Sequence, residues 1–339
     1  MSYKIAVVGA TGLVGQEMLK ILWERKIPIS EIYAFASSRS EGTYVEFGGE
    51  KIRVEEAKPD RISKADFALF SIGEEISLDL SPEVAKRGTI VIDNSNAFRM
   101  DPKVPLVVPE VNPEDLKNHH NIIANPNCST IQMVVALYPL HKRFNLEKIV
   151  VSTYQSVSGK GKDAIIELIN QTQEFLKGNN VEPKIFPYPI SFNVIPQIDN
   201  FEENNYTREE MKMVRESRKI MHLPDLKVTA TCVRIPVIRG HSESITATFS
   251  KEISLDEVYE VLSKAPGVKI LDSPKEKIYP YPLISEGKDE VFVGRIRKDL
   301  CDEKTINLWV VSDNIRKGAA LNAIQILEKL IDQGGKKWV

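Results

Sequence analysis

Cys128 is the residue in this sequence with the strongest signs of chemical reactivity. It follows a polar loop at residues 125–127, which separates an apolar stretch ending at Ala124 from an apolar-periodic run at residues 131–140. This pattern predicts a strand, a tight loop and a helix, with the thiol at the helix N-terminus. The free backbone N–H groups and the macrodipole there favour negative charge, and therefore the nucleophilic thiolate. A buried structural cysteine is the alternative interpretation.

A glycine-rich segment lies near the start of the chain. Gly9, Gly12 and Gly15 directly follow a short apolar strand at residues 4–8 and open a helical pattern. Glycine lets the backbone turn tightly and approach a pyrophosphate, which a helix N-terminus stabilises. The spacing departs from GxGxxG, so a simple glycine turn is the alternative, but the position favours a dinucleotide-binding loop.

The end of the second predicted strand, residues 32–36, indicates which dinucleotide binds. Domains that bind NAD usually place an Asp or Glu there for the ribose hydroxyls. This chain has Ser37, Ser38, Arg39 and Ser40 instead. A guanidinium with flanking hydroxyls suits a 2′-phosphate, because it meets phosphate oxygens in a forked geometry. We therefore expect NADP(H), with an ordinary polar turn as the alternative.

A nucleophilic thiol and a hydride carrier in one chain suggest a specific chemistry. The thiolate adds to an acyl carbon to give a thioester, and hydride transfer takes the thioester to a hemithioacetal that releases an aldehyde. Such a cycle needs an acid–base group that titrates near neutral pH, which favours histidine. Of five histidines, His241 has the most site-like surroundings, in the segment RIPVIRGH between two predicted strands. An ordinary loop histidine is the alternative.

Arg234 lies seven residues before His241 in the same segment. An odd offset places two residues on opposite faces of a continuous strand. They converge only if Pro236 and Gly240 turn or bulge the chain between them, and we expect that they do.

Three further charged residues have weaker support from spacing alone. Glu209 and Lys212 share one face of a predicted helix at residues 207–221, which indicates a solvated ion pair. Arg99 follows the fourth predicted strand, residues 89–93, at the end where ligands bind in open α/β sheets. It could hold an anion there, or it could be a surface arginine.

The order of the predicted elements gives an α/β protein with two domains. Strands alternate with helices over residues 1–127, which indicates a Rossmann-like, doubly wound parallel sheet that binds the nucleotide. Residues 128–313 contain runs of strands with helices set apart, which indicates an α+β catalytic and dimerisation domain. An amphipathic helix within residues 314–339 is expected to complete the first domain. The predicted strands are at 4–8, 32–36, 67–72, 89–93, 148–157, 227–235, 244–250, 291–297 and 305–311, and further helices are predicted near 82–86 and at 130–144, 163–176 and 207–221.

Composition narrows the class of protein. A chain of 339 residues is long enough for two domains with cores, and a formal charge of −2 gives no reason to expect nucleic acid or a membrane surface as partner. The three cysteines are too widely spaced for a metal pattern or a disulfide framework, so we expect no metal and a reducing, cytoplasmic location. We also expect neither a secretory leader nor a membrane-spanning segment.

Six segments taken together resemble the aspartate-semialdehyde dehydrogenase family over essentially the whole chain. Their order and spacing are jointly specific, although no single segment is. The segments are GATGLVG at 9–15, DNSNAFR at 93–99, NPNCS at 125–129, QSVSG at 155–159, RIPVIRGH at 234–241 and SDNIRKG at 312–318.

The resemblance implies roles for the matching residues. Cys128 would be the nucleophile, His241 the acid–base group, and Gln155 would help to place the substrate or the attacking groups. The implied substrate-binding residues are Arg234 for the α-carboxylate, Glu209 for the ammonium group, Arg99 and Lys212 for the leaving phosphate, and Asn127. Glu210 could take the place of Glu209, and Ser38 could share the 2′-phosphate. The implied cofactor-binding residues are Gly9, Thr11, Gly12, Leu13, Val14, Ser37, Arg39, Ser40, Ser158, Gly159 and Asn314.

The resemblance also implies a reaction: NADPH-dependent reductive dephosphorylation of L-4-aspartyl phosphate to L-aspartate 4-semialdehyde and phosphate. The product leads to lysine, threonine and methionine, and a homodimer is implied. The enzyme alternatives are N-acetyl-γ-glutamyl-phosphate reductase and a phosphorylating aldehyde dehydrogenase of the glyceraldehyde-phosphate type. The non-enzyme alternative is an NADP-sensing regulator, which would have no need for Cys128 together with His241.

Overall fold

The computed structural model describes residues 2–334 and divides the chain into two compact units. The first unit comprises Met1–Asn127 with Ala319–Val339, and the second comprises Cys128–Gly318. The sequence places the start of the returning segment at residue 314, whereas the contacts place it at Ala319. The end of that segment, residues 335–339, lies outside the described residues.

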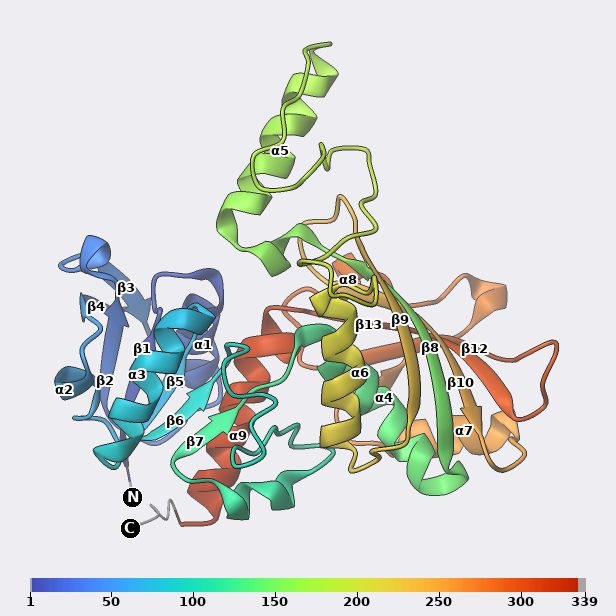
Figure 1. Cartoon of the computed structure of the whole chain (residues 1–339), viewed down its shortest axis with the longest axis horizontal. Helices are drawn as coiled ribbons and strands as arrows, with labels where there is room; N and C mark the ends of the chain where they lie inside the picture. The colour runs from blue at the N-terminus through green and yellow to red at the C-terminus, as the bar shows by residue number, and fades with distance from the viewer. Residues whose placement is uncertain (1, 335–339) are drawn as a thin grey trace. The chain divides into compact units, whose positions relative to one another are not determined.

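The first unit is built on a seven-stranded sheet of order β3-β4-β2-β1-β5-β6-β7 (Figure 1). Every neighbouring pair is parallel except β3 with β4, as a doubly wound nucleotide-binding sheet requires. The strands are β1 (Tyr3–Val8), β2 (Ile29–Ala36), β3 (Tyr44–Phe47), β4 (Glu50–Glu56), β5 (Phe67–Phe70), β6 (Ile90–Asp93) and β7 (Ile122–Ala124). The helices are α1 (Leu13–Glu24), α2 (Pro59–Ile62), α3 (Glu74–Lys86) and α9 (Leu321–Asp332).

Both faces of this sheet are covered, which explains why its strands are apolar throughout rather than alternating. Along β1, Ile5 and Val7 share a core with residues of α1 and α9. The residues between them point the other way, and Ala6 and Val8 share a core with residues of α2 and α3. The final helix therefore belongs to the same core as the first strand.

Two parts of the first unit differ from the sequence prediction. The hairpin of β3 and β4 was not predicted, although Gly48 and Gly49 make its turn with φ of +61° and +89°. The helix α3 begins at Glu74 rather than near Pro82, and Pro82 lies inside it. In the first turns of α3 the apolar residues Ile76, Leu78 and Leu80 alternate with polar ones, so the helical period is weak there.

The second unit contains a six-stranded sheet of order β11-β12-β13-β10-β8-β9. Its strands are β8 (Leu146–Gln155), β9 (Lys227–Arg234), β10 (His241–Phe249), β11 (Val268–Ile270), β12 (Val291–Lys298) and β13 (Thr305–Ser312). Its helices are α4 (Cys128–Phe144), α5 (Lys162–Leu176), α6 (Arg208–Ile220), α7 (Leu255–Ser263) and α8 (Pro282–Ser285). The chain thus combines a parallel Rossmann-like sheet with a mostly antiparallel α+β unit.

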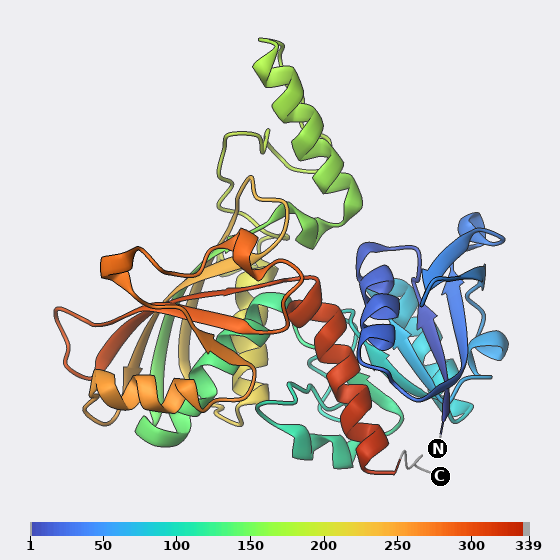
Figure 2. The ribbon, with the colours of Figure 1, turned by 180° about the vertical axis from the view of Figure 1, so that it is seen from behind.

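Helices α4 and α6 pack on the second sheet. Helix α4 packs on β8, β10 and β13, while α6 packs on β9 and on α4. Figure 2 shows α7 near the C-terminal end of α4, and the two helices are in contact. Helix α5 projects away from this sheet and packs with the residues that follow it (Figure 1).

A short π-helical turn, Arg316–Ala320, precedes α9. The sequence prediction treated residues 315–331 as one amphipathic helix, and the structure divides them between this turn and α9. Within the described residues, no helix has both the length and the apolar character needed to cross a membrane.

Candidate active site

Cys128 is the first residue of α4 and of the second unit, as the polar loop before it predicted. Its thiol is not part of a disulfide bond and is half-buried. Gly318 approaches it so closely that a Cβ built on Gly318 would lie 2.8 Å from the Cβ of Cys128. The thiol is therefore held at a helix N-terminus, which stabilises a thiolate.

Arg234, Gln155 and His241 form one row across three neighbouring strands, and we name them the active-site row. Arg234 of β9 pairs with Gln155 of β8, and the register of β8 with β10 places His241 beside Gln155. A Cβ built on Gly159 would lie 3.0 Å from Nη1 of Arg234 and 3.3 Å from Nε2 of His241. The predicted convergence of Arg234 and His241 is confirmed.

The convergence has a simple topological cause. β9 and β10 lie on either side of β8, and the segment at 235–240 carries the chain from one to the other. Gly240 adopts a φ of +92° in that turn. His241 is thus the first residue of β10 rather than part of a loop, and its position is set by the sheet.

Gln155 connects the row to a carboxylate. Its Oε1 accepts a hydrogen bond from Thr153 Oγ1 at 2.9 Å, which fixes the orientation of the amide. Its Nε2 then donates to Glu209 Oε1 at 3.1 Å and lies 3.5 Å from His241 Nε2. A buried polar network therefore joins β8, β10 and α6.

The structure separates two adjacent carboxylates that the sequence left as alternatives. Glu210 closes a capping box with Thr207 at the start of α6, and its Oε1 accepts the backbone N–H of Cys232 at 2.9 Å. Glu209 is buried and faces Gln155 and Lys212 instead. Glu210 thus holds the helix in place, while Glu209 faces the active-site row.

Lys212 belongs to a partly buried charge cluster rather than to a solvated pair. Its Nζ donates to Glu209 Oε2 at 3.2 Å and to Asp199 Oδ2 at 2.9 Å. Burial alone would raise the pKa of Asp199, but the hydrogen bond and charge of Lys212 outweigh it and lower that pKa. Asp199 was missed from sequence, because it lies in a loop with no fixed spacing to α6.

Burial controls the electrostatics of the active-site row. It lowers the pKa of His241 to about 3, with the charge of Arg234 adding to the effect and that of Glu209 opposing it. Burial also lowers the pKa of Arg234, against the charges of Glu209 and Cys128. Arg234 Nη1 donates to the Ser156 carbonyl at 2.6 Å, which aims the guanidinium. The row combines a neutral imidazole with a rigidly placed cation suited to a carboxylate.

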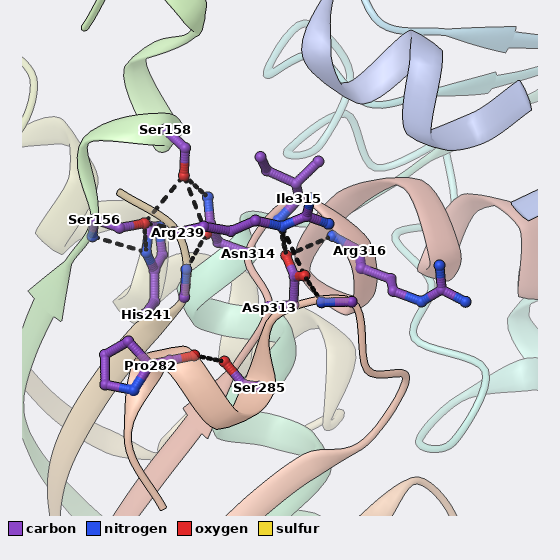
Figure 3. A network of polar contacts seen from close by, with 12 residues as sticks. Ser156, Ser158, Arg239, His241, Pro282, Ser285, Asp313, Asn314, Ile315 and Arg316 are labelled. Carbon is purple, nitrogen blue, oxygen red and sulfur yellow. Dashed lines mark hydrogen bonds and ion pairs between the residues drawn. The ribbon is translucent and has the colours of Figure 1, made fainter. Parts of the chain in front are cut away.

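Ser158 and Asn314 lie next to His241 through their hydrogen bonds with Ser156 (Figure 3). A Cβ built on Gly159 would lie 3.3 Å from His241 Nε2. Asn314 Nδ2 donates to Ser158 Oγ at 3.0 Å, and Asn314 Oδ1 accepts the Gly240 N–H at 2.9 Å. Gly159 is exposed, and the two polar side chains are buried. These three residues therefore lie beside His241 in the second unit.

In the first unit, the glycine loop between β1 and α1 leaves no room for side chains. Gly9 has a φ of +87°, and a Cβ there would lie 2.1 Å from the Ser71 carbonyl oxygen. A Cβ on Gly15 would lie 2.2 Å from the Gly9 carbonyl oxygen. Gly12 is exposed and caps α1, whose first turn contains no acidic residue. Thr11, Leu13 and Val14 are half-buried. The loop thus exposes backbone at a helix N-terminus, as pyrophosphate binding requires.

A short 3₁₀ turn, Ser38–Ser40, follows β2 and presents Arg39 to solvent. Ser37 is exposed and caps the turn, while Ser40 is half-buried. The strand ends at Ala36, so no carboxylate stands at its tip. A cation with hydroxyls around it fits a phosphate at this position.

Arg99 is buried in the first unit, which excludes the surface-arginine alternative. Its Nε donates to the Asn125 carbonyl at 3.0 Å and its Nη2 to the Asn94 carbonyl at 2.9 Å. The amide of Asn125 also donates to Asn94 Oδ1 at 2.7 Å. Asn127, buried as well, is the last residue before the second unit. Arg99 is therefore a cation fixed in place by backbone carbonyls.

The chain matches known proteins over almost its whole length. Residues 4–119 match the family model described as semialdehyde dehydrogenase, NAD binding domain, and residues 137–317 match the one described as semialdehyde dehydrogenase, dimerisation domain. The aspartate-semialdehyde dehydrogenase of Aquifex aeolicus is 54% identical over 339 residues, which covers 98% of this chain and 99% of the relative.

Solved structures agree with this similarity. Aspartate-semialdehyde dehydrogenase II from Vibrio cholerae, complexed with ASA, has a TM-score of 0.95 at 46% identity, covering 98% of this chain and 99% of that one. The Candida albicans enzyme with NADP has a TM-score of 0.77 at 26% identity, covering 99% and 100%. On the combined strength of sequence identity, coverage and fold, the chain belongs to the aspartate-semialdehyde dehydrogenase family.

Proposed function

We propose that this chain catalyses the NADPH-dependent reductive dephosphorylation of L-4-aspartyl phosphate to L-aspartate 4-semialdehyde and phosphate. The observation that carries the proposal is the arrangement in the second unit: a thiol at a helix N-terminus, with an imidazole, an amide and a guanidinium in one row. This set of groups supplies a nucleophile, an acid–base group and a carboxylate-binding cation. The product would serve the synthesis of lysine, threonine and methionine.

Cys128 starts the reaction. Its thiolate attacks the acyl carbon, a C–S bond forms, the C–O bond to phosphate breaks, and a thioester results. Arg99 and Lys212 are the cations assigned to the departing phosphate, and Asn127 is assigned to the substrate. Lys212 is already held by Asp199 and Glu209, so its position does not depend on the ligand.

Arg234 and Glu209 would recognise the amino-acid end of the substrate. A guanidinium binds a carboxylate through two parallel hydrogen bonds, and a buried carboxylate binds an ammonium group. An N-acetylated substrate has no ammonium group, so Glu209 would keep its ion pair with Lys212 but would gain no charge-assisted hydrogen bond from the substrate. This argument favours aspartyl phosphate over N-acetyl-γ-glutamyl phosphate.

NADP(H) is the cofactor that the first unit fits. Gly9, Thr11, Gly12, Leu13 and Val14 would hold the pyrophosphate, because the loop exposes backbone N–H groups where a side chain would clash. Ser37, Arg39 and Ser40 would hold the 2′-phosphate, and Ser158, Gly159 and Asn314 are assigned to the nicotinamide side. When bound, the cofactor supplies the hydride that reduces the thioester. Arg39→Ala should weaken NADPH binding and leave NADH binding unchanged.

His241 would donate and accept the proton that accompanies the reduction. It protonates the oxygen that becomes the hemithioacetal hydroxyl, and it takes that proton back when the aldehyde leaves. Gln155 holds the row together through Glu209 and Thr153. The thiol of Cys128 must remain reduced for this cycle, which favours a cytoplasmic location.

We also infer a homodimer formed through the second unit. The residues of β8 that alternate with its buried ones, among them Val150 and Tyr154, are exposed or half-buried. Tyr154 packs on Trp309 of β13, with ring centroids 5.3 Å apart, so this sheet face carries aromatic side chains. Light scattering at several protein concentrations tests the inference, and a monomer throughout would contradict it.

The deciding assay follows NADPH formation from L-aspartate 4-semialdehyde, phosphate and NADP⁺, which is the reaction in reverse. Activity should be lost in Cys128→Ala and retained in Cys301→Ser, because Cys301 is exposed and outside the site. N-acetyl-glutamate semialdehyde should be a poor substrate. Activity with that compound alone would favour the reductase alternative, and activity with neither would favour the NADP-sensing regulator.

A further inference from the structure

We propose that Ser156 is a positioning residue that serves as a two-way hydrogen-bond partner for Nδ1 of His241, so that the imidazole can both release and accept a proton at Nε2. This inference deepens the proposed function and rests on it. It concerns the groups behind the imidazole, on the side away from Nε2.

Ser156 contacts Nδ1 of His241 through two different groups. Its backbone N–H donates to Nδ1 at 3.1 Å, and its Oγ also lies 3.1 Å from Nδ1 (Figure 3). Both residues are fully buried. Solvent therefore cannot take over if either of these contacts is lost.

The backbone N–H suits only one state of the ring. An amide N–H donates and never accepts, so it requires a lone pair on Nδ1. With the lone pair there, the neutral ring carries its proton on Nε2, which then faces the Gln155 amide nitrogen at 3.5 Å, a donor and not an acceptor. That form is a resting state, because it can neither accept a proton at Nε2 nor be a strong acid.

The two forms that do chemistry both carry a proton on Nδ1. To act as a base at Nε2, the neutral ring must have its proton on Nδ1, and the imidazolium acid has protons on both nitrogens. Each form needs a hydrogen-bond acceptor facing Nδ1. The hydroxyl of Ser156 can be that acceptor, because a hydroxyl has two lone pairs as well as a donor.

Asn314 turns this hydroxyl into an acceptor for His241. Asn314 Oδ1 accepts the Gly240 N–H at 2.9 Å, and its Nδ2 donates to Ser158 Oγ at 3.0 Å, which fixes the orientation of the amide. Ser156 Oγ then donates to Asn314 Oδ1 at 3.1 Å. Ser158 Oγ also lies 3.1 Å from Ser156 Oγ. When the hydroxyl proton of Ser156 is donated to Asn314 or to Ser158, Ser156 Oγ presents a lone pair towards Nδ1.

Such an acceptor matters because the surroundings of His241 disfavour its protonation. Burial has the largest effect on its pKa, and the charge of Arg234 on β9 acts in the same direction. Glu209 on α6 and the Gly240 carbonyl act the other way. Other titratable groups nearby include Cys128 on α4, whose charge acts on Arg234, Lys212 on α6, which is paired with Glu209, and Glu243 two residues along β10. A neutral acceptor at Nδ1 helps to offset the effect of burial on the pKa of His241 without adding charge.

The proton steps balance without any gain or loss by Ser156. In the reducing direction the Nε2–H bond of the imidazolium breaks as an O–H bond forms on the oxygen of the former carbonyl. When the hemithioacetal collapses, the O–H bond breaks, Nε2–H re-forms, and the C–S electron pair returns to sulfur. Throughout, the Nδ1 proton remains donated to Ser156 Oγ.

The test compares Ser156→Ala with Ser156→Thr, which keeps the hydroxyl. We expect Ser156→Ala to lower kcat about tenfold, the lower end for loss of one hydrogen bond to a charged group, while the KM for aspartate semialdehyde stays within about twofold. The pH at which kcat falls on the alkaline side should move down by about one unit. Ser156→Thr should restore both values.

Ser285→Ala is the matched control, because Ser285 is a buried serine of the same unit that bonds to the Pro282 carbonyl and not to His241 (Figure 3). Its pH profile should match that of the wild type. If Ser156→Ala does not fold, Ser156→Cys replaces it, since a thiol is a weak acceptor. An active wild type with an unchanged kcat and pH profile in the variant overturns this inference alone. An inactive wild type overturns the proposed function.

Discussion

Gly318 and Cys128 are in such close contact that a methyl group does not fit between them. A Cβ built on Gly318 would lie 2.8 Å from the Cβ of Cys128 and 3.3 Å from its Cα. Both atoms are close to the backbone, so neither can move aside as the end of a flexible side chain could. The π-helical turn Arg316–Ala320 that carries Gly318 therefore packs directly against the start of α4.

Gly318→Ala should displace the thiol. We expect kcat to fall by about a hundredfold, as a displacement of about 1 Å in a catalytic group can cause. Overpacking should also lower the free energy of unfolding by about 1–3 kcal/mol. The rate of alkylation of Cys128, measured alongside kcat, should change in this variant. Wild-type kcat in a folded variant would show that the two elements separate easily.

Glu209→Gln and Glu210→Gln form a matched pair of neighbouring substitutions. Glu210→Gln weakens the capping box and the bond to the Cys232 N–H, so we expect a loss of about 1–2 kcal/mol in the free energy of unfolding with KM unchanged. Glu209→Gln removes the charge that faces the active-site row, so we expect KM for the amino-acid substrate to rise at least about tenfold. Lys212 loses one of its two carboxylate partners in this variant and keeps Asp199, so KM is the parameter that separates it from Glu210→Gln. A raised KM in Glu210→Gln together with an unchanged KM in Glu209→Gln would show that the two residues have the opposite roles.

His241→Gln should change how stability depends on pH. The pKa of His241 is about 3 in the folded protein, against 6.5 for an ordinary histidine. As pH falls below about 6, His241 binds a proton in the unfolded chain but not in the folded protein. The wild type therefore loses stability relative to the variant. The difference should grow by about 1.4 kcal/mol per pH unit between pH 6 and 4 in urea unfolding. A difference that does not change with pH would mean that the ring titrates normally.

Glu243→Gln should show the opposite pH dependence. Glu243 is fully buried on β10, and burial raises the pKa of its carboxyl well above 4.5, with the Gln132 side chain acting weakly the other way. Above about pH 4.5 the unfolded carboxyl ionises while the folded one keeps its proton, so the wild type loses stability as pH rises. The stability of the variant relative to the wild type should therefore increase as pH rises above about 5, by at most about 1.4 kcal/mol per pH unit. Urea unfolding at matched pH values is the measurement, and a constant gap would be evidence for an ionised carboxylate.

Features that depend on local spacing could be predicted from the sequence alone. The position of Cys128 at a helix start followed from a loop and a periodic run on either side of it. The dinucleotide loop followed from glycines between a strand and a helix, since only a chain without side chains can turn that tightly. The alternation of strands and helices, which gave the fold class, is local in the same sense.

Which polar groups come into contact depends on the three-dimensional fold. Glu209 and Glu210 are neighbours in sequence, but the helix points one to the active-site row and the other to the backbone of β9. Asp199 reaches Lys212 through a loop whose path no spacing predicts. Ser156 lies behind His241 because β8 and β10 are adjacent strands. Strand pairing joins residues that are 85 positions apart, and local patterns in a single sequence contain no information on that pairing.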